Sequence, residues 1–159
     1  MNCDSVDMAQ IDSTEATKIC DDELWDRISP DGCKKCNSEL PPEWNYFSFD
    51  NGHEIVGFWA YHFIGDHTLG IHINILSKFR RAYGMLAGLK LISHIKNNIK
   101  CVTTIVAEIP ECYPDVIKFT EKFGFKQAGV NHQSLLKNGK NTSEIILTLN
   151  IGVKTNGRS

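Results

Sequence analysis

Two adjacent arginines, Arg80 and Arg81, lie where an apolar run gives way to an amphipathic one. Residues 71–76 read as a strand, and the apolar residues from about 81 to 97 recur at three- and four-residue spacing, which predicts a helix. A turn from a strand into a helix presents free backbone N–H groups at the positive end of the helix dipole. Together with the guanidinium groups, such a turn suits a phosphate. The sequence therefore predicts an anion site at residues 80–86.

Candidates for acid–base chemistry lie on two predicted strands. Glu108 is near the end of an otherwise apolar strand, a setting that suits a general base, although an exposed strand-end glutamate explains the same pattern. His72 shares one strand face with Asn74, because both differ in parity from the neighbouring isoleucines. If that face points into a cleft, His72 is a second candidate base. A lone strand histidine is more often an ordinary packed residue, so both interpretations stay open.

The composition is that of a globular protein of one domain. The chain has 159 residues, of which 42% are hydrophobic and 23% charged, with a formal net charge of −2. This balance gives no reason to expect a nucleic-acid or membrane partner. The acidic N-terminus does not resemble a secretory signal, and no apolar run reaches membrane-spanning length, so we expect a cytoplasmic protein. We expect a flexible N-terminus (1–11), one domain (12–151) and a flexible tail (152–159).

Six cysteines are present, and Cys33 and Cys36 have the spacing of a zinc or redox pair. A structural zinc site needs a second pair of ligands, and the sequence has no second such motif. We therefore predict no metal site and reduced thiols. A thiol-based or zinc protein would regain support only if Cys101 or Cys112 lay beside the pair.

The predicted elements form an α+β fold. Hydrophobic alternation and turn residues predict a meander of antiparallel strands, and a crossover helix with a buried apolar face follows it. The expected strands are 44–49, 54–64, 68–76, 101–109, 125–130 and 143–151. We expect one or two helices within 13–28, a helix over 81–97 and a helix over 114–123. In the second of these regions, the residues expected to be buried are Met85, Leu86, Leu89, Ile92 and Ile95. The architecture is one mostly antiparallel central sheet flanked by helices.

This order of elements resembles the GNAT superfamily of N-acetyltransferases over residues 12–151. The family pattern Q/R-x-x-G-x-G/A fits Arg81 to Gly84 at its first four positions and meets Leu86 at the sixth. The resemblance implies acetyl-CoA as cofactor, with its pyrophosphate held around Arg80, Arg81, Ala82, Tyr83, Gly84, Met85 and Leu86. It also implies that the main chain of Ile75, Leu76 and Ser77 pairs with the pantetheine arm.

A second family pattern, Asn-x-x-Ala followed by Tyr-x-x-x-Gly-Phe, falls on residues 113–125. Gly124 and Phe125 match it, whereas Tyr113 stands at the Asn position and Thr120 at the position of the tyrosine that often protonates the departing thiolate. The resemblance implies Glu108 as the base, since a glutamate often lies five residues before the Asn position. Weak acid help would come from Thr120 or Tyr113.

The resemblance implies an enzyme that transfers an acetyl group to an amine by direct attack in a ternary complex. The acceptor, a small molecule or a protein, stays open, and a homodimer through residues 145–151 is possible. Residues 22–32 resemble the start of small GNAT-like proteins encoded by tailed phages, which would place the protein in a host cytoplasm. The departures at Leu86, Tyr113 and Thr120 favour an alternative, a catalytically inactive binding or inhibitory module of the same fold.

Overall fold

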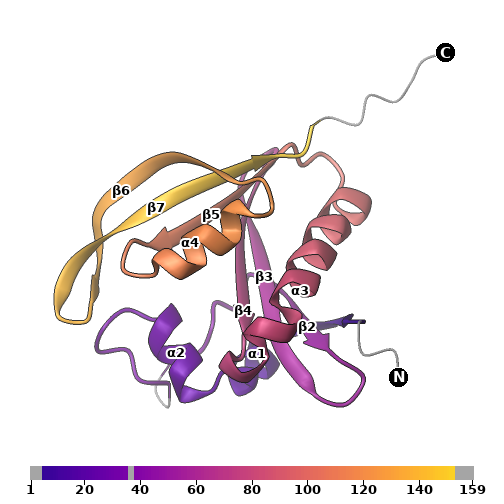
Figure 1. The fold of residues 1–159 in the computed structure, drawn as a ribbon, viewed down its shortest axis with the longest axis horizontal. Coiled ribbons are helices and arrows are strands. Elements are labelled where there is room, and N and C mark those ends of the chain that lie inside the picture. The colour runs from indigo at the N-terminus through magenta and orange to yellow at the C-terminus, as the bar shows by residue number, and fades with distance from the viewer. Residues whose placement is uncertain (1–4, 36–37, 153–159) are drawn as a thin grey trace.

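A seven-stranded sheet with the strand order β1-β2-β3-β4-β5-β7-β6 forms the centre of the protein (Figure 1). The structure is a computed structural model that describes residues 5–35 and 38–152. Only β4 and β5 pair in parallel; the other neighbours are antiparallel. The elements are β1 (Asp7–Ile11), α1 (Ser13–Ile19), α2 (Asp22–Ile28), β2 (Asn45–Asp50), β3 (Ile55–Gly65), β4 (Thr68–Ile75), α3 (Ser77–Asn98), β5 (Thr104–Pro110), α4 (Pro114–Glu121), β6 (Lys126–Lys137) and β7 (Lys140–Asn150).

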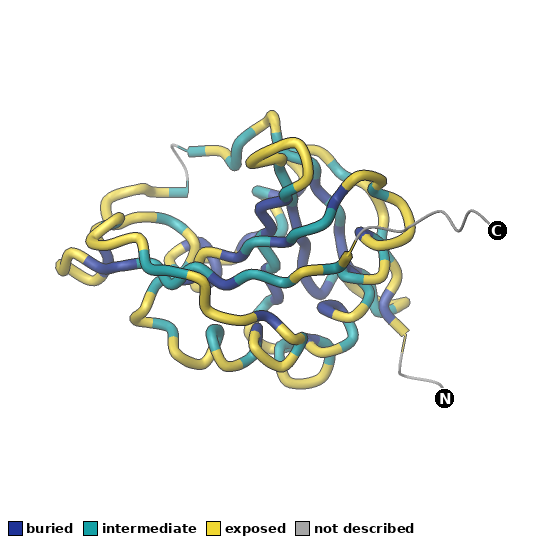
Figure 2. The backbone as a smooth tube through the Cα atoms, turned by 90° about the horizontal axis from the view of Figure 1, so that it is seen from above, coloured by how far each residue is buried: buried dark blue, intermediate teal, exposed yellow. Residues whose placement is uncertain are grey.

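Helices cover both faces of this sheet, because alternate side chains of each strand point to opposite sides. Trp59 of β3 packs in one hydrophobic cluster with residues of α3 such as Leu91. Its neighbour Phe58 packs in a second cluster with α1 and α2, through residues such as Ala16 and Leu24. Burial is concentrated in the middle of the sheet, and exposed residues follow the outer turns (Figure 2). The predicted α+β class, a mostly antiparallel sheet flanked by helices, is confirmed.

The N-terminal region contains a strand that the sequence analysis missed. Residues 7–11, expected to be part of a flexible terminus, form β1 and pair with β2. This strand has mixed burial and no clear alternation, so its pairing depends on the partner strand. The expected one or two short helices within 13–28 are two, α1 and α2, and Asp12 caps the start of α1 in a capping box with Glu15.

Helix α3 begins earlier than the sequence pattern indicated. It begins at Ser77 rather than near Arg81. Of the five residues predicted to be buried, Ile95 is buried and Leu86 and Ile92 pack partly buried against the core. The buried residues of α3 are Gly84, Ala87, Gly88, Leu91 and Ile95, whereas Met85 and Leu89 are 41% and 55% exposed. The small residues allow close packing, since a Cβ on Gly88 would clash with the ring of Phe123. The prediction favoured large apolar side chains and so overlooked a face made largely of small ones.

Strand β7 lies inside the sheet, because it pairs with β5 on one side and β6 on the other. The main chain of residues 145–150 is therefore already paired. A second copy of the chain could extend the sheet only at β1 or β6, which are the edge strands.

Gly57 marks a place where β3 and β4 approach too closely for any side chain. A Cβ at this position would clash with the carbonyl oxygen of Asn74 and would lie 2.9 Å from the Cα of Ile75. Both are backbone atoms of β4, so they can move only if the strand itself shifts. Gly57 therefore fixes the spacing of the two strands where β4 leads into α3.

We expect Gly57→Ala to lower the free energy of unfolding by about 2 kcal/mol or more, the cost of overpacking against a backbone. Chemical denaturation measures this change. Gly65→Ala is the matched control, because a Cβ at Gly65 of the same strand meets nothing within 4 Å. Equal stability of the two variants would contradict the proposed close approach.

Candidate functional site

The site is built on a divergence of two parallel strands. Strands β4 and β5 pair only where residues 68–70 face residues 104–106, and they separate beyond this point. Between them and the surrounding helices lies a cavity of about 820 Å³, within the range of ligand sites. Its wall includes residues of α2, α3, α4 and the β6–β7 hairpin. The divergence therefore leaves a large pocket in the middle of the sheet.

The edge of β4 that faces this pocket carries unpaired main-chain groups. The Leu76 N–H donates to the Val56 carbonyl on the β3 side. Because hydrogen-bonding direction alternates along an antiparallel strand, the N–H and C=O groups of Ile71, Ile73 and Ile75 point toward β5. The Ile75 carbonyl already accepts from Arg80 Nε at 2.9 Å. Ile73, which lies beyond the last residues paired with β5, thus offers main-chain groups without a partner strand among the described residues to an extended ligand.

The predicted phosphate turn is not a turn. Residues 81–86 lie inside α3, where the main-chain N–H groups are used by helical hydrogen bonds. Arg80, Arg81 and Gly84 line the pocket, as does Ile75, whereas the remaining predicted contacts do not: Leu76, Ser77, Ala82, Tyr83, Met85 and Leu86. Leu76 immediately precedes the helix and offers no side-chain cap. No turn residue separates strand from helix, so the pattern of apolar residues alone located the helix start wrongly.

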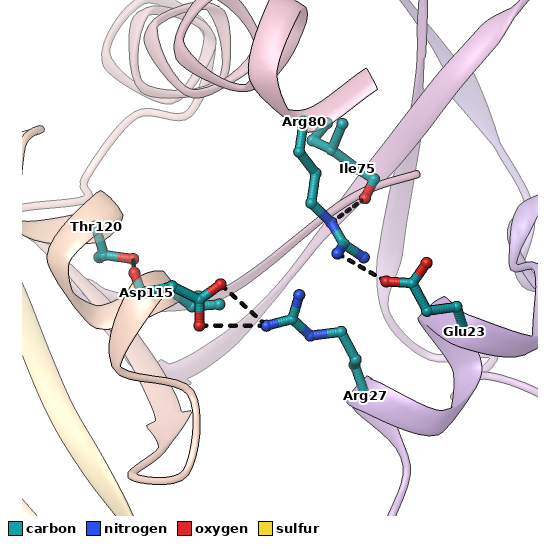
Figure 3. Close-up of polar contacts among 7 residues, drawn as sticks. Glu23, Arg27, Ile75, Arg80, Asp115 and Thr120 are labelled. Atoms are coloured by element: carbon teal, nitrogen blue, oxygen red, sulfur yellow. Dashed lines mark hydrogen bonds and ion pairs between the residues drawn. The ribbon is translucent and has the colours of Figure 1, made fainter. Parts of the chain in front are cut away.

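Ion pairs join α2 to the helices on the other side of the pocket. Glu23 accepts from Arg80 Nη1 at 2.9 Å. Arg27 donates to Asp115 at 3.2 Å and lies 4.6 Å from the centre of the Tyr113 ring. Figure 3 shows both α2 side chains reaching across, one toward α3 and one toward α4.

The pKa of Glu23 is lowered, first by a hydrogen bond from the Ser77 side chain and then by one from Arg80. Ser77 is the first residue of α3. A carboxylate of the protein itself, that of Glu23, therefore lies close to the start of α3, where the sequence analysis expected a phosphate group of the ligand.

Charged side chains of opposite sign line the pocket from different elements. Arg81 of α3, Lys118 of α4 and Lys122, the C-cap of α4, line it as cations, and Glu108 and Glu144 line it from β5 and β7. Within residues 5–35 and 38–152, none of these side chains is in an ion pair. The strand register sets Glu144 opposite Pro110, so the two glutamates share a face. We call the two glutamates the acidic end of the pocket and the three cations its cationic end.

Glu108 and His72 lie on the same face of the sheet and line the pocket from opposite sides of the gap. Continuing the register of Gly70 with Val106 would place them side by side. Both also line a small cavity of about 70 Å³, together with His62. The structure thus brings the two predicted base candidates together.

His72 is packed beneath an indole. The Trp44 ring stacks on His72 at 4.3 Å and on His62 at 4.5 Å between ring centres. Burial, with a smaller effect of the neighbouring His62, lowers the pKa of His72 to about 4. Its Nε2 is buried without a hydrogen-bond partner among the described residues. His72 is therefore neutral at pH 7.

The two candidate acids differ in availability. The Thr120 hydroxyl is buried and donates to the Val116 carbonyl at 2.9 Å, so its proton is already engaged. Tyr113 immediately precedes α4 and lines the pocket. Burial raises the pKa of its phenol, which keeps the proton on the oxygen. Tyr113 is the better placed donor.

Several pocket residues were not singled out as site residues in the sequence analysis. Arg27 lines the pocket from α2, and Lys118 of α4 and Lys122, its C-cap residue, line it at helical spacing. The spacing was visible in the sequence, but which face of each short helix would meet the pocket was not. Trp44 carried no signal beyond its size.

Cys36 lies outside the described residues, so the structure does not describe its pairing with Cys33. The Cys33 carbonyl accepts from the Trp25 indole at 3.0 Å. No group of three potential metal-ligating side chains occurs in the part of the chain that the structure describes. In that same part, no helix has the length and apolar character needed to cross a membrane.

Comparison with known proteins gives matches in structure only. No family model matches the sequence, and no curated protein matches it. A GNAT family acetyltransferase from Elizabethkingia anophelis, solved with acetyl-CoA bound, is similar at a TM-score of 0.71 and 17% identity, covering 93% of this chain and 99% of that one. A mutant of the spermidine N-acetyltransferase SpeG from Vibrio cholerae is similar at a TM-score of 0.73 and 8% identity, covering 91% of this chain and 93% of that one.

A ribosomal-protein-alanine N-acetyltransferase from Brucella melitensis is similar at a TM-score of 0.71 and 13% identity, covering 91% of this chain and 99% of that one. These proteins act on different acceptors by their names, and at such identities the likeness concerns the fold. The chain has the fold of the GNAT acetyltransferases.

Proposed function

We propose that the protein is an acyl-CoA-dependent N-acyltransferase that transfers an acetyl group to an amine within a ternary complex. The observation that carries this proposal is the pocket at the β4–β5 divergence, with cations at one end and carboxylates at the other. An anionic donor and a cationic acceptor would occupy opposite ends of such a pocket. The likeness to a GNAT acetyltransferase solved with acetyl-CoA supports the choice of donor.

The residues present fit acetyl-CoA in part. The main-chain groups of Ile73, beyond the last pairing with β5, would pair with an extended arm of the ligand. Arg81, Lys118 and Lys122 would hold its phosphates through side-chain charge, because the N–H groups of residues 81–86 are engaged within α3. When bound, acetyl-CoA would supply the acyl group as a thioester, whose C–S bond breaks as the C–N bond of the amide forms.

Glu108 would act as the general base. An amine that is protonated at pH 7 must lose a proton before its nitrogen can attack, and the Glu108 carboxylate lines the pocket with no ion pair among the described residues. His72, neutral in its buried position, would accept a hydrogen bond from the amine or from a bridging water. The small cavity beside both residues has room for a few waters, at about 30 Å³ of liquid volume each.

Tyr113 would return a proton to the departing sulfur. Its phenol is protonated at pH 7 and lines the pocket, whereas the proton of Thr120 is held by Val116. Glu108 would pass both protons lost by the nitrogen to solvent, one after the other, and the Tyr113 phenolate would regain one proton from solvent. Atoms then balance, since the acceptor ammonium and the thioester give an amide, a free thiol and one released proton.

A second candidate function is a catalytically inactive binding module of the same fold. Two observations favour it: the expected phosphate turn is helical, and the Phe119 and Phe123 rings pack against Gly84 and Gly88 of α3. Binding of acetyl-CoA separates the two candidates.

Acetyl-CoA should bind the wild-type protein, and Arg81→Glu should weaken binding by about tenfold or more, because a charge at the cationic end is reversed. Isothermal titration calorimetry measures both. Lys96→Glu is the matched control, since Lys96 lies on α3 but does not line the pocket. No binding at millimolar acetyl-CoA would favour the binding module.

The variant Glu108→Gln should lower kcat about 100-fold, the usual contribution of a general base, and should leave the dissociation constant of acetyl-CoA unchanged. Thiol release with n-butylamine as acceptor reports the rate. Glu121→Gln, on the exposed part of α4, should behave as wild type. Full activity of Glu108→Gln would assign the base elsewhere.

His72 should make the protein less stable in acid. Its folded-state pKa of about 4 lies below the ordinary value of 6.5, so only the unfolded chain takes up this proton as the pH falls through that window. Between pH 7 and pH 5, wild type should lose about 2 kcal/mol more unfolding free energy than His72→Gln. Urea denaturation at each pH measures the loss.

As a control, His132→Gln, at an exposed position of β6, should keep the wild-type slope. If His72→Gln also kept it, the buried imidazole would not be the cause.

A further inference from the structure

Helix α2 is fastened to every element that surrounds it at the acidic end of the pocket. It is joined to α3 through Glu23 and Arg80, to α4 through Arg27 and Asp115, and to the tip of the β6–β7 hairpin through a set of hydrogen bonds. These three sets of contacts hold α2 over the pocket. We propose that α2 is a fixed cover and that the acceptor is a small, free cationic amine, not a side chain of a folded protein or a peptide. This inference rests on the proposed acyl transfer.

A buried lysine makes the first contact between α2 and the hairpin. Lys137, at the end of β6, is only 2% exposed. Its ammonium group donates to the carbonyl of Ser29 at 2.8 Å and to that of Asp26. These carbonyls belong to the C-terminal end of α2, where the helix dipole favours a cation. A buried ammonium that lost these partners would be costly, so the contact is not easily opened.

An aspartate makes the second contact. The Asp31 carboxylate accepts from the N–H groups of Asn138 at 3.0 Å and Gly139 at 2.7 Å, at the turn between β6 and β7. The Asp31 N–H donates to the Leu136 carbonyl at 3.0 Å. The hydrogen bond from Gly139, with a weaker one from Asn138, holds the pKa of Asp31 below its usual value. We call these contacts of residues 26–31 with residues 136–139 the clasp.

The clasp closes a wall of the pocket. Residues from both halves line the cavity: Ser29 and Pro30 on one side, and Leu135 and Lys137 on the other. On the opposite side of α2, the ion pairs of Glu23 and Arg27 span to α3 and α4 (Figure 3). An extended peptide needs a groove that is open along its length. Here the cover is bonded on both sides, so a compact ligand fits and a continuous chain does not.

The charges behind the cover indicate the chemistry of that ligand. Glu108 and Glu144 face the cavity without an ion pair among the described residues. Of the cations that line the pocket on or beside α2, Arg27 and Arg80 are paired with carboxylates of α4 and α2, and the Lys137 ammonium donates to main-chain carbonyls. The carboxylates of Glu108 and Glu144 against this one ammonium leave a net negative charge, which favours an amine that arrives protonated.

The test compares acceptors that carry the same reacting amine on a butyl chain and differ only in bulk: n-butylamine, Nα-acetyl-lysine amide and a hexapeptide with one lysine. Thiol release from acetyl-CoA gives kcat/KM for each. In wild type, kcat/KM for n-butylamine should exceed kcat/KM for the hexapeptide at least about tenfold. Asp31→Ala and Lys137→Met, which open the clasp, should each reduce this ratio of the two kcat/KM values about tenfold.

Asp50→Ala is the matched control, because Asp50 also accepts a turn N–H, that of Gly52, in a hairpin that does not line the pocket. It should keep the wild-type ratio. Circular dichroism checks that each variant is folded. If Lys137→Met fails to fold, Asp31→Ala still tests the clasp, because Asp31 is exposed at the surface.

A hexapeptide used as well as n-butylamine by wild type, an unchanged ratio in folded Asp31→Ala, or no turnover of any amine would each overturn the inference. Calorimetry with acetyl-CoA distinguishes the causes. Binding without the expected selectivity overturns the inference about the cover alone, whereas no binding overturns the proposed function with it.

Discussion

The divergence of β4 from β5 is the constraint on which the rest of the structure depends. Parallel pairing ends after Gly70 and Val106, and beyond that point β4 pairs with β3 on one side and has no described partner strand on the β5 side. An unpaired strand edge inside a protein leaves polar groups that need hydrogen bonds. Part of the need is met by Arg80, which donates to the Ile75 carbonyl. The remaining main-chain groups face the pocket, so the place where β4 and β5 diverge is also the candidate ligand site.

Helices hold the two halves of the sheet around this opening. Helix α3 follows β4 without a loop and packs closely through Gly84, Ala87 and Gly88, which leaves room for the aromatic rings of α4. Helix α2 spans the other side and is bonded to α3, α4 and the β6–β7 hairpin. Exposed ion pairs each contribute little to stability, about 0–1 kcal/mol. The buried Lys137 is the contact that best explains the fixed position of α2.

The pocket separates opposite charges with the same elements that frame it. Arg81 and the lysines of α4 come from the helical side, and Glu108 and Glu144 come from neighbouring strands. Between them, His72 is kept neutral by burial beneath Trp44. Transfer between an anionic donor and a cationic acceptor requires such a separation, because groups of one sign throughout would repel one of the two ligands.

The sequence by itself determined the kinds of element and their order. Alternation predicted the strand meander, and apolar spacing predicted the crossover helix. Strand parity also placed His72 on one face, and the resemblance to GNAT enzymes pointed to Glu108 near the end of a strand. These features depend on residues close together in the chain, where local geometry decides the outcome.

The tertiary structure alone decided where α3 begins, which face of it is buried and what closes the pocket. Nothing beside Leu76 signals a helix start, and small residues rather than large ones face the core. The clasp joins Asp31 to Gly139 across more than a hundred residues. No local pattern encodes such a contact, because it exists only once the strand order has brought the β6–β7 turn to the end of α2.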